Sequence, residues 1–320
     1  DVPTSVQRLT EVEIRRVPGG LQDVSRSILS LPGVAGGVDN RNDVLVRGGG
    51  PSENAYYLDG IRVPQINHFA TQGTAGGAVG LLNVDFIQDV SFFTGGFSAP
   101  YGDALSSVLR VQNRPGNRDG WAGDFTLGAT EAGLTLDGPL GNTATGLFSI
   151  RRSYLQFLFQ ALGLPIRPNY WDAQMGVTWE PTGRDRISFV GIGAIDDFDI
   201  VQPGPDDDYE NQEIYQRVLD NNQRTFTVGG TWQRLVGRSG VMRLRLSHSY
   251  IDFDFANRDP DEVPILQNKS LENDTRIELS GEMDMSRRVR LAVGGELARA
   301  SIDSDVFQAA IPGGILPEDV

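Results

Sequence analysis

The sequence has no cysteine, only two histidines and no long apolar run. Without cysteine, neither a disulfide framework nor a thiolate metal site is possible. The two histidines, His68 and His248, show no metal-ligand spacing, so we expect no metal and no other cofactor. Because no stretch of 18 apolar residues occurs, we expect no transmembrane helix. A membrane barrel remains possible, since its strands need only about ten residues, with alternate ones polar.

Basic residues are outnumbered, with 28 Lys and Arg against 42 Asp and Glu and a formal net charge of −14. Nucleic acid is therefore not an expected partner, because no basic stripe is available to replace phosphate counterions. Many acidic residues fall between Asp196 and Asp220. Calcium prefers such oxygen ligands, but the run lacks a recognisable site spacing, and a solvated acidic loop is the simpler interpretation.

Catalytic motifs are incomplete in this chain. Gly48–Gly50 lacks the Lys-Ser/Thr pair that follows in a phosphate-binding loop. Gly96–Pro100 is similar to a nucleophile elbow but lacks the final glycine of that motif. We therefore expect no enzymatic activity, and no catalytic residue is assigned.

The first 115 residues mix helical and strand patterns. Thr10 and Glu13 form a capping-box pattern that predicts a short helix from Glu11 to Val17. Apolar residues three or four positions apart, from Leu21 to Leu31, predict a second helix. Strands are predicted at 44–47, 55–58, 61–63, 88–94 and 107–113, with a polar loop at 64–80 and a helical turn at 81–86.

The stretch from Asp43 to Pro64 organises this region. Gly48–Gly50 and Pro51 interrupt its first strand, because glycine reaches positive φ without steric cost and proline fixes φ. Further on, Asp59-Gly60 lies between two apolar runs, which is a strong hairpin signal. We therefore expect a small β unit here.

After residue 120 the polarity alternates with a period of two. Phe226, Val228 and Trp232 share one face of a predicted strand, and hydroxyl or amide residues occupy the other. Such alternation is also typical of a soluble sandwich, so it does not by itself identify a membrane barrel. Nine strands are predicted, at about 121–129, 131–138, 144–152, 169–180, 184–197, 221–236, 240–254, 271–284 and 288–302.

The connection lengths favour the membrane barrel. Short connections are centred on 141–143, 181–183, 237–239 and 285–287, and long ones cover about 153–168, 198–220 and 255–270. Short periplasmic turns and long extracellular loops at opposite ends are the outer-membrane arrangement. Aromatic residues fall near the expected interfaces, with Trp121 and Trp179 at one end and Tyr154, Tyr170 and Trp171 at the other. The stretch 155–164 fits either a helix or a strand extension.

Four motifs occur in order: LPGV at Leu31–Val34, LVRGGG at Leu45–Gly50, YLDGIRV at Tyr57–Val63 and GGFSAPYGDALSSVLRV at Gly95–Val111. This series resembles the plug domain of TonB-dependent outer-membrane receptors. The resemblance implies an α+β plug domain at 1–115, followed at 116–320 by antiparallel transmembrane β-barrel strands. Nine strands would be the N-terminal part of a plugged barrel of roughly 22 strands.

The resemblance also implies roles for particular residues. In that family, plug loops at the place of 64–77 face outward and touch ligand, so the ligand-binding candidates are Asn67, His68, Phe69 and Gln72. A plain solvated loop fits the same residues. The candidates for contact between plug and barrel are Arg47, Glu53 and Asp59, and the interface is expected to be polar.

The implied function is active, TonB-energised import of a scarce nutrient, such as a siderophore, vitamin, glycan or peptide, across the outer membrane of a Gram-negative-type bacterium. The implied partners are a TonB-type energy-coupling protein, outer-membrane lipid, the ligand and a surface lipoprotein. The alternative is a surface-anchored structural or assembly barrel that binds partner proteins without transport.

Overall fold

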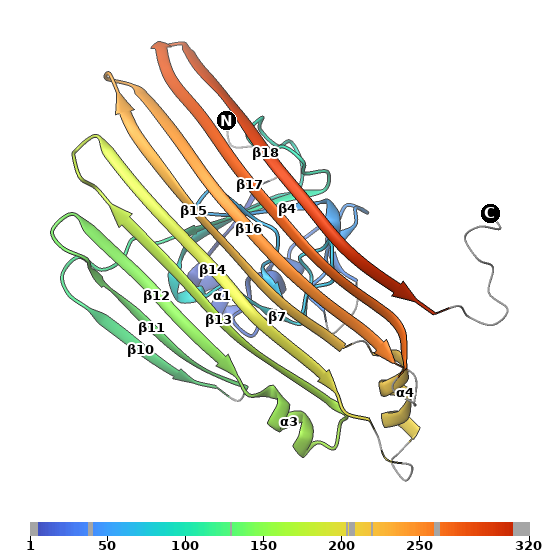
Figure 1. Ribbon diagram of the computed structural model, residues 1–320. Helices are drawn as coiled ribbons and strands as arrows, with labels where there is room; N and C mark the ends of the chain where they lie inside the picture. The colour runs from blue at the N-terminus through green and yellow to red at the C-terminus, as the bar shows by residue number, and fades with distance from the viewer. Residues whose placement is uncertain are drawn as a thin grey trace, which may run out of the picture.

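The computed structural model describes residues 6–37, 41–128, 130–202, 204, 209–218, 220–258 and 263–309. Its strands form a five-stranded sheet, a nine-stranded sheet and two small two-stranded sheets. The five-stranded sheet belongs to the N-terminal domain, and the nine-stranded sheet, here called the wall, follows it in the chain (Figure 1). Within these residues, no helix is both long and apolar enough to cross a membrane.

The N-terminal domain combines short strands and short helices. Its main sheet has the order β1-β8-β9-β4-β5, in which β4 and β9 run parallel and the other neighbours antiparallel. In chain order, its elements are β1 (Val6–Thr10), α1 (Glu11–Arg16), α2 (Val24–Leu29), β2 (Val34–Gly36), β3 (Val44–Val46), η1 (Pro51–Glu53), β4 (Asn54–Leu58), β5 (Ile61–Val63), β6 (Asn67–His68), β7 (Val79–Gly80), η2 (Val84–Phe86), β8 (Ile87–Phe93) and β9 (Ser107–Asn113).

The capping box at α1 is confirmed. The amide of Thr10 donates to Glu13 Oε2 over 2.7 Å, and the amide of Glu13 donates to Thr10 Oγ1 over 3.4 Å. Helix α2 begins later than predicted, because Leu21 and Gln22 have positive φ and cannot be helical. Asp23 caps α2 instead, accepting from the amide of Ser25 over 2.7 Å.

The predicted hairpin at Asp59-Gly60 is also confirmed. It joins β4 to β5, and both turn residues have positive φ, 51° for Asp59 and 82° for Gly60. That pair of conformations matches the right-handed twist of the flanking strands and favours glycine at the second position. The turn points towards the wall, where a Cβ on Gly60 would lie 3.0 Å from Arg245 Nε.

The wall is a meander in which each strand pairs antiparallel with its neighbour in the chain. All nine predicted strands are confirmed, most of them longer than expected. They are β10 (Ala122–Leu127), β11 (Glu131–Pro139), β12 (Ala144–Ser153), β13 (Ile166–Trp179), β14 (Asp185–Ile200), β15 (Asp220–Val236), β16 (Gly240–Arg258), β17 (Pro264–Ser286) and β18 (Val289–Gln308).

The register confirms the two faces of the wall. Leu246 pairs with Ile277, which pairs with Leu297, and all three side chains are exposed. On the other face, Arg245 pairs with Glu278. Since side chains on one strand alternate between faces, a continuous apolar row on one side requires a polar row on the other.

One of the three long connections is shorter than predicted, and the other two contain helices. The one predicted at 255–270 is much shorter, because β16 continues to Arg258 and β17 begins at Pro264. Polar residues extend this ladder beyond the apolar band, with Lys269 Nζ 3.5 Å from Asp254 Oδ2. The undecided stretch after β12 forms α3 (Leu155–Ala161), and α4 (Tyr209–Arg217) lies in the next long connection.

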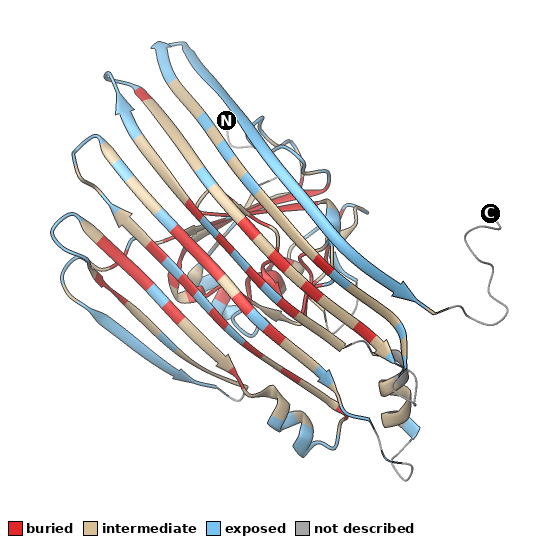
Figure 2. Cartoon of the chain, viewed as in Figure 1, coloured by how far each residue is buried: buried red, intermediate tan, exposed pale blue. Residues whose placement is uncertain are grey.

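The N-terminal domain packs against the polar face of the wall. Figure 2 shows buried residues along the middle of the central wall strands, whereas β18 is exposed along its whole length. The hydrophobic core of the domain continues into the wall, where it includes Val190, Ile192 and Ala194 of β14. The long connections that contain α3 and α4 lie at the same end of the wall (Figure 1).

Candidate functional site

The loop from Pro64 to Leu81 is fixed to the wall through His68. Its Nδ1 lies 2.6 Å from Asp196 Oδ1 on β14, and its Nε2 lies 3.1 Å from Asp172 Oδ2 on β13. The ring also stacks on Tyr170, with 3.8 Å between ring centroids. The side chains of His68, Tyr170, Asp172 and Asp196 are almost fully buried. Arg151 of β12 also contacts Asp172, and we refer to His68, Asp172, Asp196 and Arg151 as the latch cluster.

The latch cluster favours the imidazolium form of His68. Burial opposes that charge, but the charge of Asp196 and the hydrogen bonds with Asp172 and Asp196 raise the pKa of His68 to about 9. A buried ion pair is stable only when its geometry is good and its remaining polar atoms are satisfied. The amide of Phe69 supplies one such bond, donating to Asp196 Oδ2 over 2.8 Å.

Arg151 of β12 extends the latch cluster to the next turn of the loop. Its guanidinium donates to the carbonyl oxygens of Gly80 and Leu81 over 3.0 and 2.9 Å, and its Nε lies 3.0 Å from Asp172 Oδ2. A planar guanidinium suits this role because it offers five donors in a fixed fork. Both ends of the loop are thus held by the same group of wall residues.

Further polar contacts join the domain to the wall. Gln72 donates to Glu272 Oε1 over 2.8 Å and accepts from Asn268 over 2.8 Å. Asn83 donates from its amide to Gln174 Oε1 over 3.0 Å and from its side chain to Thr135 Oγ1 over 3.1 Å. These four hydrogen bonds attach the domain to β11, β13 and β17 of the wall.

The expectation of a polar interface is only partly right. Val190, Ile192 and Ala194 of β14 face the domain and join its hydrophobic core. Ile61 of β5 packs closely on β15, where a Cβ on Gly229 would lie 2.7 Å from Ile61 Cγ1. Glycine at position 229 therefore allows the hairpin to approach the wall. The apolar contact adds to the stability that must be lost if the domain moves.

The four ligand-binding candidates do not form an open surface. Asn67, His68 and Phe69 are 2%, 0% and 5% exposed, and Gln72 is half-buried against the wall. Asn67 donates to the carbonyl oxygen of Ala75 over 2.6 Å within the loop. Phe69 packs edge-to-face on Phe198 with 5.6 Å between ring centroids. Their assignment to ligand binding stays a prediction, and in this structure they hold the loop in place.

The three candidates for contact with the barrel make their hydrogen bonds inside the N-terminal domain. Arg47 is exposed with a φ of 51°, and Glu53 accepts from the amide of Gly50 over 3.2 Å. Asp59 accepts from the amide and side chain of Asn113, both over 2.8 Å, and faces Arg186 of the wall. Burial raises the pKa of Asp59, and the bonds from Asn113 counteract this rise. The role of these three residues stays a prediction.

The sequence pattern missed the wall side of the interface. Tyr170, Asp172 and Gln174 alternate with exposed residues on β13, and Asp196 ends a similar inward row on β14. Buried polar residues on the inward face were the available signal. Asp196 is buried in the latch cluster rather than solvated, while Asp206–Asp208 of the same acidic run lie outside the described residues. Over the residues with described positions, no group of three His, Cys, Asp or Glu side chains could hold a metal ion.

Comparison with known proteins agrees with this architecture. Residues 1–108 match the family described as TonB-dependent Receptor Plug Domain. The TonB-dependent transporter Oar of Myxococcus xanthus is 32% identical over 104 residues, which are 32% of this chain and 9% of that protein. The siderophore receptor PirA of Pseudomonas aeruginosa has a TM-score of 0.66 at 15% identity, over 95% of this chain and 49% of that one.

The alcaligin outer-membrane receptor FauA of Bordetella pertussis gives a similar result, with a TM-score of 0.68 at 12% identity over 96% of this chain and 49% of that chain. The chain thus spans about half the length of these solved structures. At such low identity, the likeness establishes the shared fold, and the match over residues 1–108 establishes the type of N-terminal domain. Residues 1–108 therefore belong to the TonB-dependent receptor plug domain family, and the chain shares the fold of the TonB-dependent outer-membrane receptors, with the plug domain packed against nine antiparallel strands.

Proposed function

We propose that this protein imports a scarce nutrient across the outer membrane, with energy delivered to the plug by a TonB-type protein. Residues 1–115 act as the plug and 116–320 as part of the barrel. The observation that carries the proposal is the latch cluster, which holds loop 64–81 to the wall through a small set of polar contacts. Such contacts can be exchanged for water. Release of the plug must in addition separate its apolar contact with Val190, Ile192 and Ala194 of β14.

The ligand-binding candidates fit this proposal in a particular way. Gln72 lies where a ligand approaching from the α3 and α4 end meets the loop. His68 and Phe69 become available only when the loop leaves the wall, because their partners lie there. Asn67 is bonded to Asn42 and Ala75 within the plug, so it becomes available only if the loop itself opens. We propose that ligand contact and loop release are coupled at these four residues.

A covalent tether between plug and barrel tests the mechanism. A Cβ on Gly229 would lie 2.7 and 2.9 Å from Cγ1 and Cγ2 of Ile61, which are both bonded to Cβ of Ile61. The two Cβ positions therefore approach the separation that a disulfide needs, roughly 3.5–4.5 Å. The double variant Ile61→Cys/Gly229→Cys should close this tether, and the chain has no native cysteine to interfere.

The readout is growth of the source bacterium in nutrient-limited media where deletion of the receptor impairs growth. The tethered variant should fail to restore growth until a reductant is added. Thr227→Cys/Ser249→Cys is the matched control, because these paired residues lie within the wall with their hydroxyl oxygens 2.9 Å apart. Equal growth with both disulfides intact would show that plug movement is not needed and would favour the assembly-barrel alternative.

A further inference from the structure

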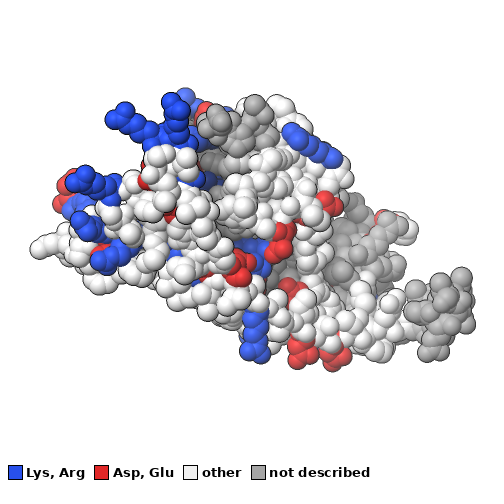
Figure 3. Space-filling model, turned by 90° about the horizontal axis from the view of Figure 1, so that it is seen from above, with Lys and Arg blue, Asp and Glu red and all other residues white. Residues whose placement is uncertain are grey.

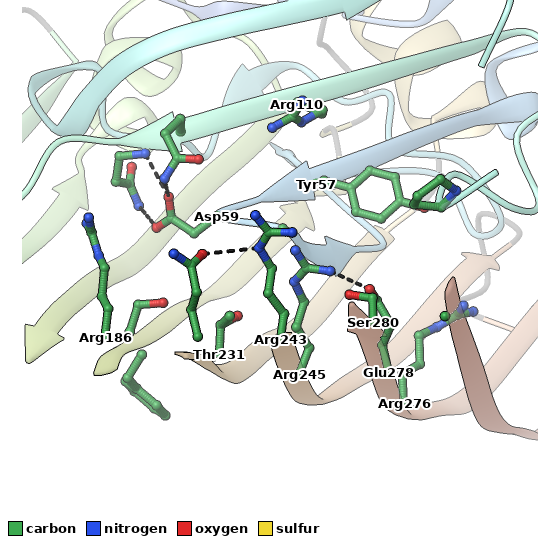
Figure 4. Close-up of a pocket in the computed structure, with 18 of the residues that line it drawn as sticks. Tyr57, Asp59, Arg110, Arg186, Thr231, Arg243, Arg245, Arg276, Glu278 and Ser280 are labelled. Atoms are coloured by element: carbon green, nitrogen blue, oxygen red, sulfur yellow. Dashed lines mark hydrogen bonds and ion pairs between the residues drawn. The ribbon is translucent and has the colours of Figure 1, made fainter. Parts of the chain in front are cut away.

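A cavity of about 840 Å³ lies between the plug and the wall. The plug side includes Tyr57, the Asp59-Gly60 turn and Arg110, and the wall side is formed by strands β12 to β18 (Figure 4). Arg186 and Arg243 lie close to the short turns of the wall, because β14 begins at Asp185 and β16 at Gly240. The cavity therefore lies on the opposite side of the plug from the ends that carry α3 and α4.

Arginines outnumber carboxylates around this cavity. Its lining includes six arginines and four acidic residues. Three wall arginines are neutralised by ion pairs: Arg243 with Glu282 over 3.1 Å, Arg245 with Glu278 over 2.5 Å and Arg276 with Glu296 over 2.7 Å. Arg114 pairs with Asp137. The carboxylate of the fourth acidic residue, Asp59, accepts hydrogen bonds from the side-chain amides of Gln112 and Asn113.

Among the described residues, Arg110 has no ion-pair partner, and Arg186 has only a long contact with Glu180 besides facing Asp59. The guanidinium of Arg110 lies 5.7 Å from the ring centroid of Tyr101, and Arg186 Nη1 is 4.0 Å from Glu180 Oε1 at the nearest. Arg110 comes from the plug and Arg186 from the wall, and both reach the cavity (Figure 4). Arg110 on the plug side and Arg186 on the barrel side are thus the cavity arginines that lack a short ion pair.

Two tyrosines of the plug also line the cavity. Tyr57 and Tyr101 line the cavity and pack edge-to-face with 5.3 Å between ring centroids. Guanidinium groups match carboxylate and phosphate oxygens with paired hydrogen bonds, which are about twice as strong as neutral ones. A neutral or cationic ligand would form no ion pair with Arg110 or Arg186.

We propose that this cavity binds an anion with several carboxylate or phosphate groups, held by Arg110 of the plug and Arg186 of the barrel. The inference deepens the proposed import function and rests on it for its biological role, since an anion here lies between the plug and the short turns. Binding itself requires no energy coupling. Because one contact comes from each domain, the affinity depends on the position of the plug.

Isothermal titration calorimetry on the purified full-length receptor in detergent tests the site, with citrate and pyrophosphate as separate probes. Citrate binding alone identifies a carboxylate site, pyrophosphate binding alone a phosphate site, and binding of both a general oxyanion site. Arg110→Gln/Arg186→Gln should weaken binding at least tenfold. Arg238→Gln removes another exposed arginine, from a turn outside the cavity, and should leave the affinity unchanged.

The single variant Arg186→Gln provides a second measurement if the double variant folds poorly, and it should also weaken binding. The proposal is overturned if neither probe binds, or if the Arg110 and Arg186 variants bind as tightly as Arg238→Gln. The growth experiment with the tethered receptor is independent of this result. If the anion binds and the tethered variant grows normally, the import mechanism is rejected and the anion site is supported. If growth depends on the tether and no anion binds, the anion site is rejected and the import mechanism is supported.

Discussion

His68 carries its charge in a place that excludes water, between two carboxylates of the wall. Asp172 is shared with Arg151, whereas Asp196 has only His68 and the amide of Phe69 among its described polar contacts. Loss of the imidazole would therefore leave Asp196 a buried charge without a cation. Breaking a buried pair by removing one partner is strongly destabilising, because the other charge stays uncompensated.

We expect His68→Leu to weaken the attachment of loop 64–81 by about 3–5 kcal/mol. Hydrogen exchange measured by mass spectrometry should show faster exchange in this loop and little change in the outer wall strands. His248→Leu is the matched control, because His248 is a partly exposed wall residue whose Nδ1 lies 2.9 Å from Thr275 Oγ1. Equal protection of the loop in both variants would contradict a latching role for His68.

The latch should also respond to pH. The pKa of His68 in the folded protein is about 9, above its ordinary value of 6.5, so the folded state holds the proton more tightly than the unfolded state. The resulting stabilisation is complete below pH 6.5 and is lost as the pH rises through about 9. The charged groups that face the ring are Asp172 and Asp196, with Arg151 and Glu131 behind them.

Loop exchange in the wild type should therefore accelerate between pH 6.5 and 9, after correction for intrinsic exchange rates. The His68→Leu variant should lack this step. A step of the same size in both proteins would mean that another group titrates.

Residue roles of this kind were hard to predict from the sequence, because His68 and its partners are separated by more than 100 residues. Only the fold brings them together.

At the scale of elements, local patterns carried most of the information. The capping box, the Asp59-Gly60 hairpin and all nine wall strands were predicted, because each depends on neighbours within a few residues. β1 and β2 were missed. Each is a short strand whose pairing, with β8 and β3 respectively, decides its conformation. Strand ends were underestimated where charged residues continue the ladder beyond the apolar band.

The outward face of the wall is expected to meet lipid, which can be tested at single positions. Ile277 lies in the apolar row formed with Leu246 and Leu297, and it is 46% exposed. We expect Ile277→Arg to destabilise the full-length receptor in lipid bilayers by about 2–4 kcal/mol, because the guanidinium would enter hydrocarbon. Unfolding by denaturant in liposomes would measure this free energy.

Ala300→Arg is the control for added charge and volume. Ala300 faces the other side of β18 and pairs with Asp274, so an arginine there has a carboxylate within reach. Its unfolding free energy should stay close to that of the wild type. If the two variants are equally stable, the outward row does not meet lipid and the assignment of faces is wrong.

At the scale of the whole molecule, the two ends of the wall differ in shape and charge. One end carries the long connections with α3 and α4, and the other carries short turns with the exposed arginines Arg184, Arg238, Arg287 and Arg288. Figure 3 shows Lys and Arg side chains gathered mainly on one side of the molecule as seen from above. The relation between plug and wall could not be derived from the sequence, since it depends on contacts between distant segments.

Orientation in the membrane is the last testable consequence. Outer-membrane barrels have short periplasmic turns and long extracellular loops. The end with α3 and α4 should therefore face the medium, and the short turns should face the periplasm.

Gly163, which follows α3, and Gly183, in the turn between β13 and β14, suit small epitope insertions because a Cβ at either position would meet nothing within 4 Å. On intact cells, antibody should label the tag at 163 and not the tag at 183, while permeabilised cells should show both. This result would also place the arginine-lined cavity on the periplasmic side of the plug. Surface labelling at 183 with none at 163 would reverse the orientation and would place the arginine-lined cavity on the outer side of the plug.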